Sequence, residues 1–173
     1  MRHVPPAPVH DVPADESAFP MAEPDDVAAS EARVRYRTCG VEPVEADEGI
    51  RGLLVSGEDV VAVRRNVALD RRLASAREPV VDSIRGDLYV TTKRLVHVGD
   101  CVLTFDLEEI EDSALAGDTV LLLLGDGVGV ALRTDRPRLL RVQIAAARAA
   151  RASRPELRAD RAQPSSRPEP ASR

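Results

Sequence analysis

Three residues near the middle of the chain carry the side chains of a nucleophilic triad: His97, Asp100 and Cys101. A cysteine thiolate activated by a histidine, itself oriented by a carboxylate, is a recurrent catalytic arrangement. Here two of these residues lie at adjacent strand ends around a two-residue turn, and the sequence suggests no oxyanion donor. We therefore interpret His97 as an edge or half-buried imidazole and Cys101 as a small apolar strand residue.

Residues 125–129, Gly-Asp-Gly-Val-Gly, superficially resemble a phosphate-binding glycine loop. That mechanism requires a helix N-terminus after the loop, so that free backbone amides meet the phosphate. Here the residues that follow have the pattern of a strand. The glycines therefore predict a hairpin turn and no nucleotide-binding cofactor site.

Acidic, histidine and cysteine residues also fail to specify a metal or redox site. The four acids of one connection predict a solvated face. His3 and His10 are too loosely spaced for metal ligands, and the two cysteines are too few and too far apart for a disulfide framework. We expect free thiols, no cofactor and no metal. The residues concerned are Glu108, Glu109, Glu111, Asp112, Asp11, Cys39 and Cys101.

Composition divides the 173-residue chain into three parts. Residues 1–48 hold seven of the thirteen prolines and eleven acids against four arginines, so we expect a mostly disordered acidic arm. Within it, 25–38 are compatible with a short helix or a brief strand. Residues 49–152 form the predicted folded domain, and 153–173 a disordered basic tail rich in Pro, Ser and Arg.

The whole chain has a formal charge of -5 and only 2% aromatic residues. Acidity and the lack of aromatic stacking platforms argue against nucleic-acid binding. The first residues contain no apolar run of the kind that a signal peptide needs. A cytoplasmic protein with an aliphatic core is the expectation.

Period-two apolar patterns separated by Gly-Asp turns predict seven strands in the folded domain. In the first strand Val61, Val63, Val67 and Leu69 are expected to share one face. A long loop is predicted over 71–85, although 80–81 could add a short strand. The predicted strands are 59–69, 87–91, 94–98, 101–106, 111–116, 119–124 and 128–133.

One helix follows these strands. Thr134 or Asp135 is the predicted cap, Pro137 fits the first turn, and an Ala-rich amphipathic helix continues over 138–151. Short hairpin connections without helices between strands exclude a doubly wound parallel sheet. The pattern predicts a mainly β fold, a seven-stranded antiparallel barrel or sandwich capped by one C-terminal helix.

Three short motifs resemble the bacterial pleckstrin-homology-like and GRAM domains. They are Gly57-Glu-Asp-Val, then Gly86-Asp-Leu-Tyr-Val-Thr-Thr-Lys-Arg-Leu, and Phe105-Asp-Leu-Glu-Glu-Ile. The resemblance covers roughly 52–150 and implies the pleckstrin-homology-like fold. It also implies that the loop after the first strand and the tip of the central hairpin lie at the same open end of the barrel.

That arrangement would gather five cations into a site for an anionic lipid headgroup, because arginine donates through a fork that suits phosphate. The residues are Arg71, Arg72, Arg77, Lys93 and Arg94. Because no catalytic pair, cofactor motif or metal cluster is specified, we predict a non-enzymatic module that binds an unidentified protein partner. The alternative is peripheral binding to an anionic membrane through these five residues. The sequence does not define an oligomeric state.

Overall fold

The computed structural model describes residues 23–73 and 83–153. Seven antiparallel strands form one sheet in the order β4-β3-β2-β1-β7-β6-β5, and a helix follows the last strand. This confirms the predicted fold class, a mainly β fold with seven antiparallel strands and one C-terminal helix. The elements are α1 (Glu23–Cys39), α2 (Glu48–Arg51), β1 (Val60–Leu73), β2 (Ile84–Thr91), β3 (Arg94–Gly99), β4 (Val102–Asp106), β5 (Ile110–Ala116), β6 (Thr119–Leu124), β7 (Val128–Arg133) and α3 (Pro137–Ala152).

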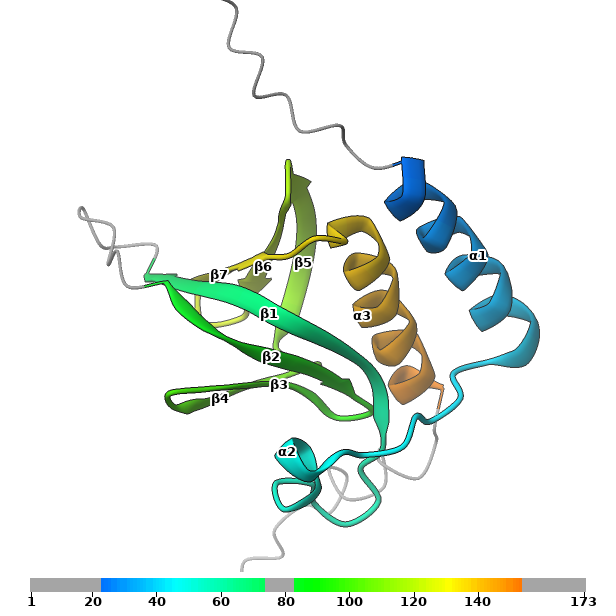
Figure 1. Cartoon of the computed structure of the whole chain (residues 1–173), viewed down its shortest axis with the longest axis horizontal. Helices are drawn as coiled ribbons and strands as arrows, with labels where there is room; N and C mark the ends of the chain where they lie inside the picture. The colour runs from blue at the N-terminus through cyan, green and yellow to red at the C-terminus, as the bar shows by residue number, and fades with distance from the viewer. Residues whose placement is uncertain (1–22, 74–82, 154–173) are drawn as a thin grey trace, which may run out of the picture.

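Strand β1 joins the two halves of the sheet. It pairs with β2 along most of its 14 residues and with β7 from Ala68 to Leu73. Its register shifts between Arg64 and Val67, where Asn66 adopts a φ of 54°. A bulge of this kind bends a strand and increases its twist, so one continuous sheet can fold around a core. Figure 1 shows the resulting two layers, with β1–β4 set at an angle to β5–β7.

The bulge also corrects one prediction about β1. Val61, Val67 and Leu69 lie in the main core, but Val63 packs on the opposite face of the sheet with Ile50 and Tyr89. The register of β1 against β2 also shifts between Val60 and Ala62, and each of the two shifts changes which side chains face inward. The predicted common face of β1 is therefore wrong at Val63.

The other predicted faces are correct. All six aliphatic side chains predicted to line one face of β6 and β7 are buried in the main core: Val120, Leu122, Leu124, Val128, Val130 and Leu132. In the β2–β3 hairpin, Leu88, Val90 and Leu95 face this core, whereas Tyr89 and Val96 face the other side. Helix α3 closes the core with Leu140, Ile144 and Ala147.

His97 is fully buried, not half-buried as predicted, and it supports the bulge in β1. Its Nε2 lies 3.1 Å from the carbonyl oxygen of Val67, on the far side of β2. Gly86 of β2 leaves room for this reach, because a Cβ atom there would lie 2.8 Å from Cε1 of His97. The imidazole thus bonds to backbone and is enclosed, which leaves no room for a role as a catalytic base.

Helix α1 occupies part of the arm that composition predicted to be mostly disordered. For 25–38 the sequence left a helix and a strand open, and the structure has a 17-residue helix there. Ala29 and Ala32 are buried against Leu139 and Val142 of α3. This packing buries apolar side chains of a mainly polar segment, and of the two alternatives left open for 25–38 the helix is the one that forms. Residues 1–22 and 154–173 lie outside the described residues.

Asp25 of α1 caps α3. Its carboxylate accepts hydrogen bonds from the backbone N–H groups of Arg138 (2.8 Å) and Leu139 (3.0 Å). The residue before the helix makes no side-chain cap bond, so the predicted cap at Thr134 or Asp135 is wrong. A carboxylate from a distant segment satisfies the free amides at the helix start, where it is also favoured by the helix dipole. Figure 1 shows α1 beside α3, on the side away from the sheet.

Candidate functional site

Four of the five basic residues predicted to form one site are described by the structure, and these four are not brought together. Arg71 and Arg72 lie near the end of β1, paired with β7, whereas Lys93 and Arg94 lie at the β2–β3 turn. Thr91 beside that turn pairs with Val60, at the start of β1. Arg77 lies outside the described residues. The two groups are therefore separated by about the length of β2, some 25 Å for eight residues.

This correction follows from the topology of antiparallel strands. The connection before a strand and the connection after it always lie at opposite ends of that strand. The β1–β2 connection and the β2–β3 turn flank the same strand and cannot share an end of the barrel. Binding of an anionic lipid by Arg71 and Arg72 remains a prediction, but the two arginines do not share one cluster with Lys93 and Arg94.

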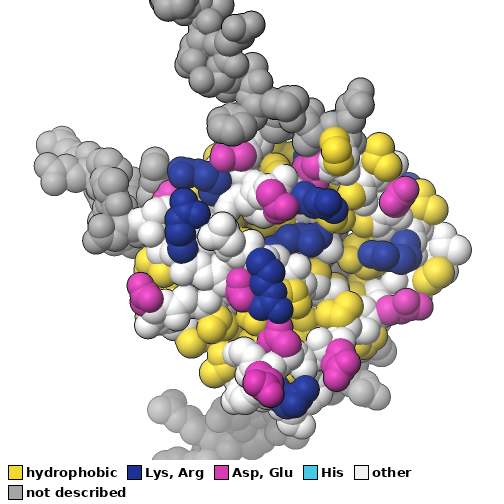
Figure 2. Space-filling view, viewed as in Figure 1, with side chains coloured by type: hydrophobic (Ala, Val, Ile, Leu, Met, Phe, Trp, Pro, Cys, Tyr) yellow, Lys and Arg dark blue, Asp and Glu magenta, His cyan; other side chains and the backbone are white. Residues whose placement is uncertain are grey.

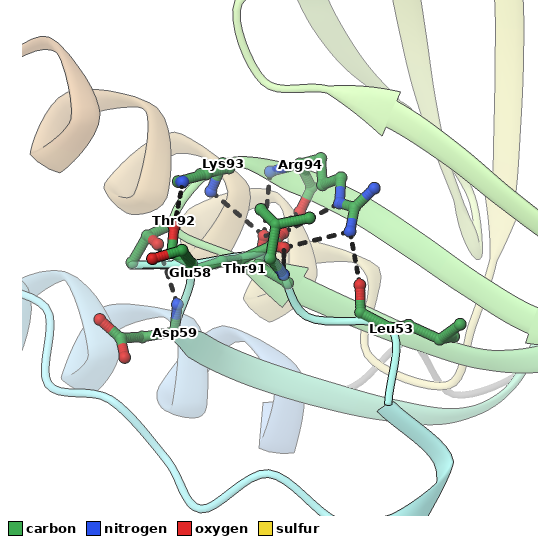
Figure 3. A network of polar contacts seen from close by, with 9 residues as sticks. Leu53, Glu58, Asp59, Thr91, Thr92, Lys93 and Arg94 are labelled. Atoms are coloured by element: carbon green, nitrogen blue, oxygen red, sulfur yellow. Dashed lines mark hydrogen bonds and ion pairs between the residues drawn. The ribbon is translucent and has the colours of Figure 1, made fainter. Parts of the chain in front are cut away.

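Arg94 is engaged with the fully buried side chain of Glu58 (Figure 3). Its Nε donates to Oε1 of Glu58 at 3.0 Å and its Nη2 to Oε2 at 3.1 Å. The Thr91 hydroxyl (2.7 Å) and the backbone N–H of Val55 (2.9 Å) donate to the same carboxylate. Arg94 also donates to the carbonyl of Leu53 at 2.7 Å. The guanidinium therefore fastens the 53–58 segment to the β2–β3 turn.

The electrostatics of Glu58 reflect these bonds. Burial acts to raise its pKa, but hydrogen bonds from Arg94, the Val55 amide and Thr91 outweigh it and hold the pKa below the ordinary 4.5. Lys93 is also engaged, because its Nζ donates to the carbonyl of Ser56 at 2.6 Å. The Gly-Glu and Thr-Thr-Lys-Arg motifs that carried the family resemblance thus form a structural clamp.

A second polar cluster covers the outer face of β1 and β2. Arg65 forms ion pairs with Asp47 (2.6 Å) and Asp87, and the Tyr89 hydroxyl lies 3.0 Å from Asp47. Hydrogen bonds from Arg65 and Tyr89 outweigh the effect of burial and hold the pKa of Asp47 below its ordinary 3.8. Burial, and then Asp47, raise the pKa of Tyr89. These groups stabilise one another's ordinary charge states, so the cluster fastens the segment before β1 to the sheet.

The remaining candidates for chemistry are structural or isolated. Cys101 is an exposed free cysteine, whereas His97 is buried inside the domain. The two side chains therefore do not form a catalytic triad with Asp100. Gly125 and Gly127 belong to the turn between β6 and β7, as predicted. Over 23–73 and 83–153, no group of three or more His, Cys, Asp or Glu residues could hold a metal ion.

The described residues do form a groove, between the second halves of α1 and α3. Its volume is about 540 Å³, within the range of cavities that bind ligands. Helix α3 contributes a floor of small residues, and α1 contributes arginines and a tyrosine. The lining is Arg33, Tyr36, Arg37, Gly40, Val41, Val142, Ala145, Ala146, Ala149, Ala150 and Ser153.

The fully buried contacts between the two helices lie near their starts, and the groove lies beyond them. Asp25, Ala29 and Ala32 of α1 hold that end against α3, with Leu139 and Val142 filling the interface. Beyond Val142 the side chains of α3 that face α1 are alanines, which do not fill the space between the two helices. Sequence reasoning missed this groove because it treated α1 as part of an arm. The available signal was the row of small residues on α3.

The α1 side of the groove is positively charged. Neither Arg33 nor Arg37 has an ion pair or a side-chain hydrogen bond with any residue that the structure describes, whereas Arg35 lies over the ring of Tyr36 at 5.2 Å. Three of the four acids of α1 lie in its first turn, where Asp26 pairs with Arg138, and Glu31 is not among the residues that line the groove. Figure 2 shows apolar surface beside Lys and Arg side chains over α1 and α3. The groove thus combines an apolar floor with unpaired cations.

Among the described residues, no helix has the length and apolar character needed to cross a membrane. The sequence matches no protein-family model and no curated protein. Solved structures with similar folds include the Vps36 N-terminal PH domain, with 17% identity, a TM-score of 0.46, and coverage of 64% of this chain and 92% of that one.

Two others are the C-terminal domain of an unknown protein from Leishmania infantum and a chain of the 8S snRNP assembly intermediate. The first has 13% identity and a TM-score of 0.41, with 58% of this chain and 92% of that chain covered. The second has 14% identity and a TM-score of 0.41, with 66% of this chain and 90% of that chain covered. At such scores the similarity assigns no partner to this chain.

Proposed function

We propose that this chain is a non-catalytic interaction module that binds a segment of another protein in the groove between α1 and α3. Pleckstrin-homology-like folds typically serve as such modules. The observation that carries the proposal is the apolar groove bordered by Arg33 and Arg37, for which the described residues supply no counter-ions. Burial of apolar side chains on the alanine floor supplies binding energy, and the arginines select an acidic partner.

The groove is a better candidate than the outer face of the sheet or the β2–β3 turn. The outer face of β1–β3 is already covered by the segment around Ile50, which is fully buried against Tyr89 and Val96. At the β2–β3 turn, Arg94 and Lys93 are held by Glu58 and Ser56. The helical layer therefore offers a surface that combines unpaired positive charge with open apolar area.

The test is retention of partner proteins from the source organism by the full-length chain and by two variants in the last turns of α3. Ala149→Glu places a charge on the groove floor, and Ala152→Glu places the same charge on an exposed residue outside the lining. Both carry the same penalty of an acid near a helix C-terminus, so they form a matched pair. We expect Ala149→Glu to lose the partner and Ala152→Glu to keep it.

Equal retention by the two variants would contradict the groove as the binding site. Phosphatidylserine vesicles at low salt provide a separate arm, together with Arg71→Glu. Vesicle binding that Arg71→Glu abolishes and Ala149→Glu leaves unchanged would favour the anionic headgroup as the ligand and overturn the protein-binding proposal.

A further inference from the structure

We infer that the occupant of the groove is an acidic amphipathic helix of the partner protein, lying antiparallel to α1 and α3. This inference rests on the proposed function and adds the secondary structure, charge and direction of the bound segment. Each of these three properties follows from a different feature of the groove.

The floor of the groove has the spacing of a helix-packing seam. Val142, Ala145, Ala146, Ala149, Ala150 and Ser153 stand at intervals of three and four residues along α3. Such a row extends for about 16 Å along the helix axis, about three turns. Small side chains let a neighbouring helix approach to the distances of roughly 8–10 Å found between packed helices. An apolar face with i, i+3, i+4 and i+7 side chains fits this floor.

Charge defines the second property. Arg33 and Arg37 are four residues apart on α1, so they lie on the same side, one turn apart, along the groove. Two carboxylates one turn apart on a bound helix could each accept hydrogen bonds from one guanidinium fork. The bound helix should therefore carry Asp or Glu at i and i+4 beside its apolar face.

Direction follows from the way α1 and α3 are aligned. Asp25 in the first turn of α1 binds the first turn of α3, and the groove is lined by the later turns of both helices. The two helices therefore run parallel, and their C-terminal ends, each with a partial negative charge, lie together. An antiparallel helix places its positive N-terminal end there. Acidic residues in its first turn then also lie close to Arg37.

The flanking segments of this chain do not have the required sequence. Residues 1–22 contain five prolines, and residues 154–173 carry five arginines against three acids. Neither sequence has the acidic, period-3.6 pattern that the groove calls for. This comparison favours another protein as the source of the bound helix.

A displayed library of random 16-residue peptides, selected on the immobilised full-length chain, tests the inference. The selected peptides are then measured against Ala149→Glu, Ala152→Glu and the double variant Arg33→Glu/Arg37→Glu. We expect peptides with helical apolar spacing and acids at i and i+4. Their affinity should fall at least tenfold with Ala149→Glu and with the double variant, and stay within twofold with Ala152→Glu. Replacing the peptide acids with lysines should restore binding to the double variant.

The outcomes separate the two proposals. The selected peptides could instead be basic, proline-rich or β-branched and still lose binding to Ala149→Glu. That result would contradict the acidic helix as the occupant and leave the groove as the binding site. Peptides that are insensitive to Ala149→Glu, or no enrichment at all, would overturn the inference and the proposed function together.

The orientation of the bound peptide is measured separately, by paramagnetic relaxation. Cys39 is an exposed free cysteine at the end of α1, next to the groove residue Gly40, and takes a spin label in a Cys101→Ser background. An antiparallel peptide should show stronger relaxation of its N-terminal resonances than of its C-terminal ones. The reverse gradient would overturn the antiparallel assignment.

Discussion

Replacing Arg94 with methionine would leave the carboxylate of Glu58 buried without its cation. The Glu58 side chain is fully inaccessible, and after the substitution it keeps only the Thr91 hydroxyl and the Val55 amide as donors. Removing one partner of a buried ion pair costs about 3–5 kcal/mol, and the lower end applies here because the Arg94 side chain is 21% exposed. We therefore expect the free energy of unfolding to fall by about 3 kcal/mol.

Substituting Glu58, the other partner of the ion pair, should lower the free energy of unfolding by less. Glu58→Gln preserves the shape of the side chain, and Arg94 keeps the Leu53 carbonyl and its partial access to water. We expect a loss of about 1–2 kcal/mol. In the double variant Glu58→Gln/Arg94→Met no charge is buried without a partner. The double variant should therefore be more stable than the sum of the single losses predicts, by about 2 kcal/mol.

Urea unfolding followed by circular dichroism measures these values, since the chain has no tryptophan. Arg71→Met is the matched control, because Arg71 is exposed on β1 and should change stability by less than about 0.5 kcal/mol. If Arg94→Met costs no more than Arg71→Met, or if the single losses are additive, the clamp is not a coupled pair. Arg94 would then be available for a ligand, as first predicted.

Four further predictions concern other parts of the fold. Because the pKa of Glu58 is lower in the folded state than its ordinary 4.5, its contribution is complete above that pH and is lost as the pH falls through the folded value. Urea midpoints measured from pH 7 to pH 3 should therefore fall less steeply for Glu58→Gln than for the wild type, and parallel curves would exclude this role. Asp25→Ala should lower the unfolding free energy by about 1–2 kcal/mol and speed amide exchange in the first turn of α3, whereas Asp26→Ala should not change that exchange. Gly86→Ala should lower the free energy of unfolding by about 3 kcal/mol or more, because the added methyl group clashes with His97 and the backbone of Val98. A loss below about 1 kcal/mol would contradict the close packing. Arg64→Met should raise stability by about 1 kcal/mol, since burial lowers the pKa of Arg64 and its Nε has no hydrogen-bond partner among the described residues; a loss would show that the guanidinium is satisfied in solution.

The fold could be predicted because its signals are local. Alternating aliphatic residues and Gly-Asp turns fix the number, order and inward faces of strands that follow one another through hairpins. The alternation fails at Val63, where the positive φ of Asn66 marks a bulge that no periodicity displays.

The groove could not be predicted from the sequence, because it depends on contacts between residues that are far apart in the chain. Composition averaged over 1–48 hid a helix whose stability comes from α3, more than a hundred residues later. The cap at Asp25 and the groove follow from that same contact, so neither has a local signature. The basic constellation failed for a different reason. Strand connectivity alone places Arg71 and Arg94 at opposite ends of β2, and the family resemblance was applied without that test.

The hydrogen bonds from α3 to Asp25 span 113 and 114 positions in the sequence. During synthesis, α1 leaves the ribosome long before the segment that it caps, and it has no partner to pack against until the sheet and α3 have been made. Contacts of such separation form late, after the loop between them has been closed by the rest of the domain. The groove therefore comes into existence only after α3 has been made. A partner that recognises it would distinguish chains that include α3 from shorter ones.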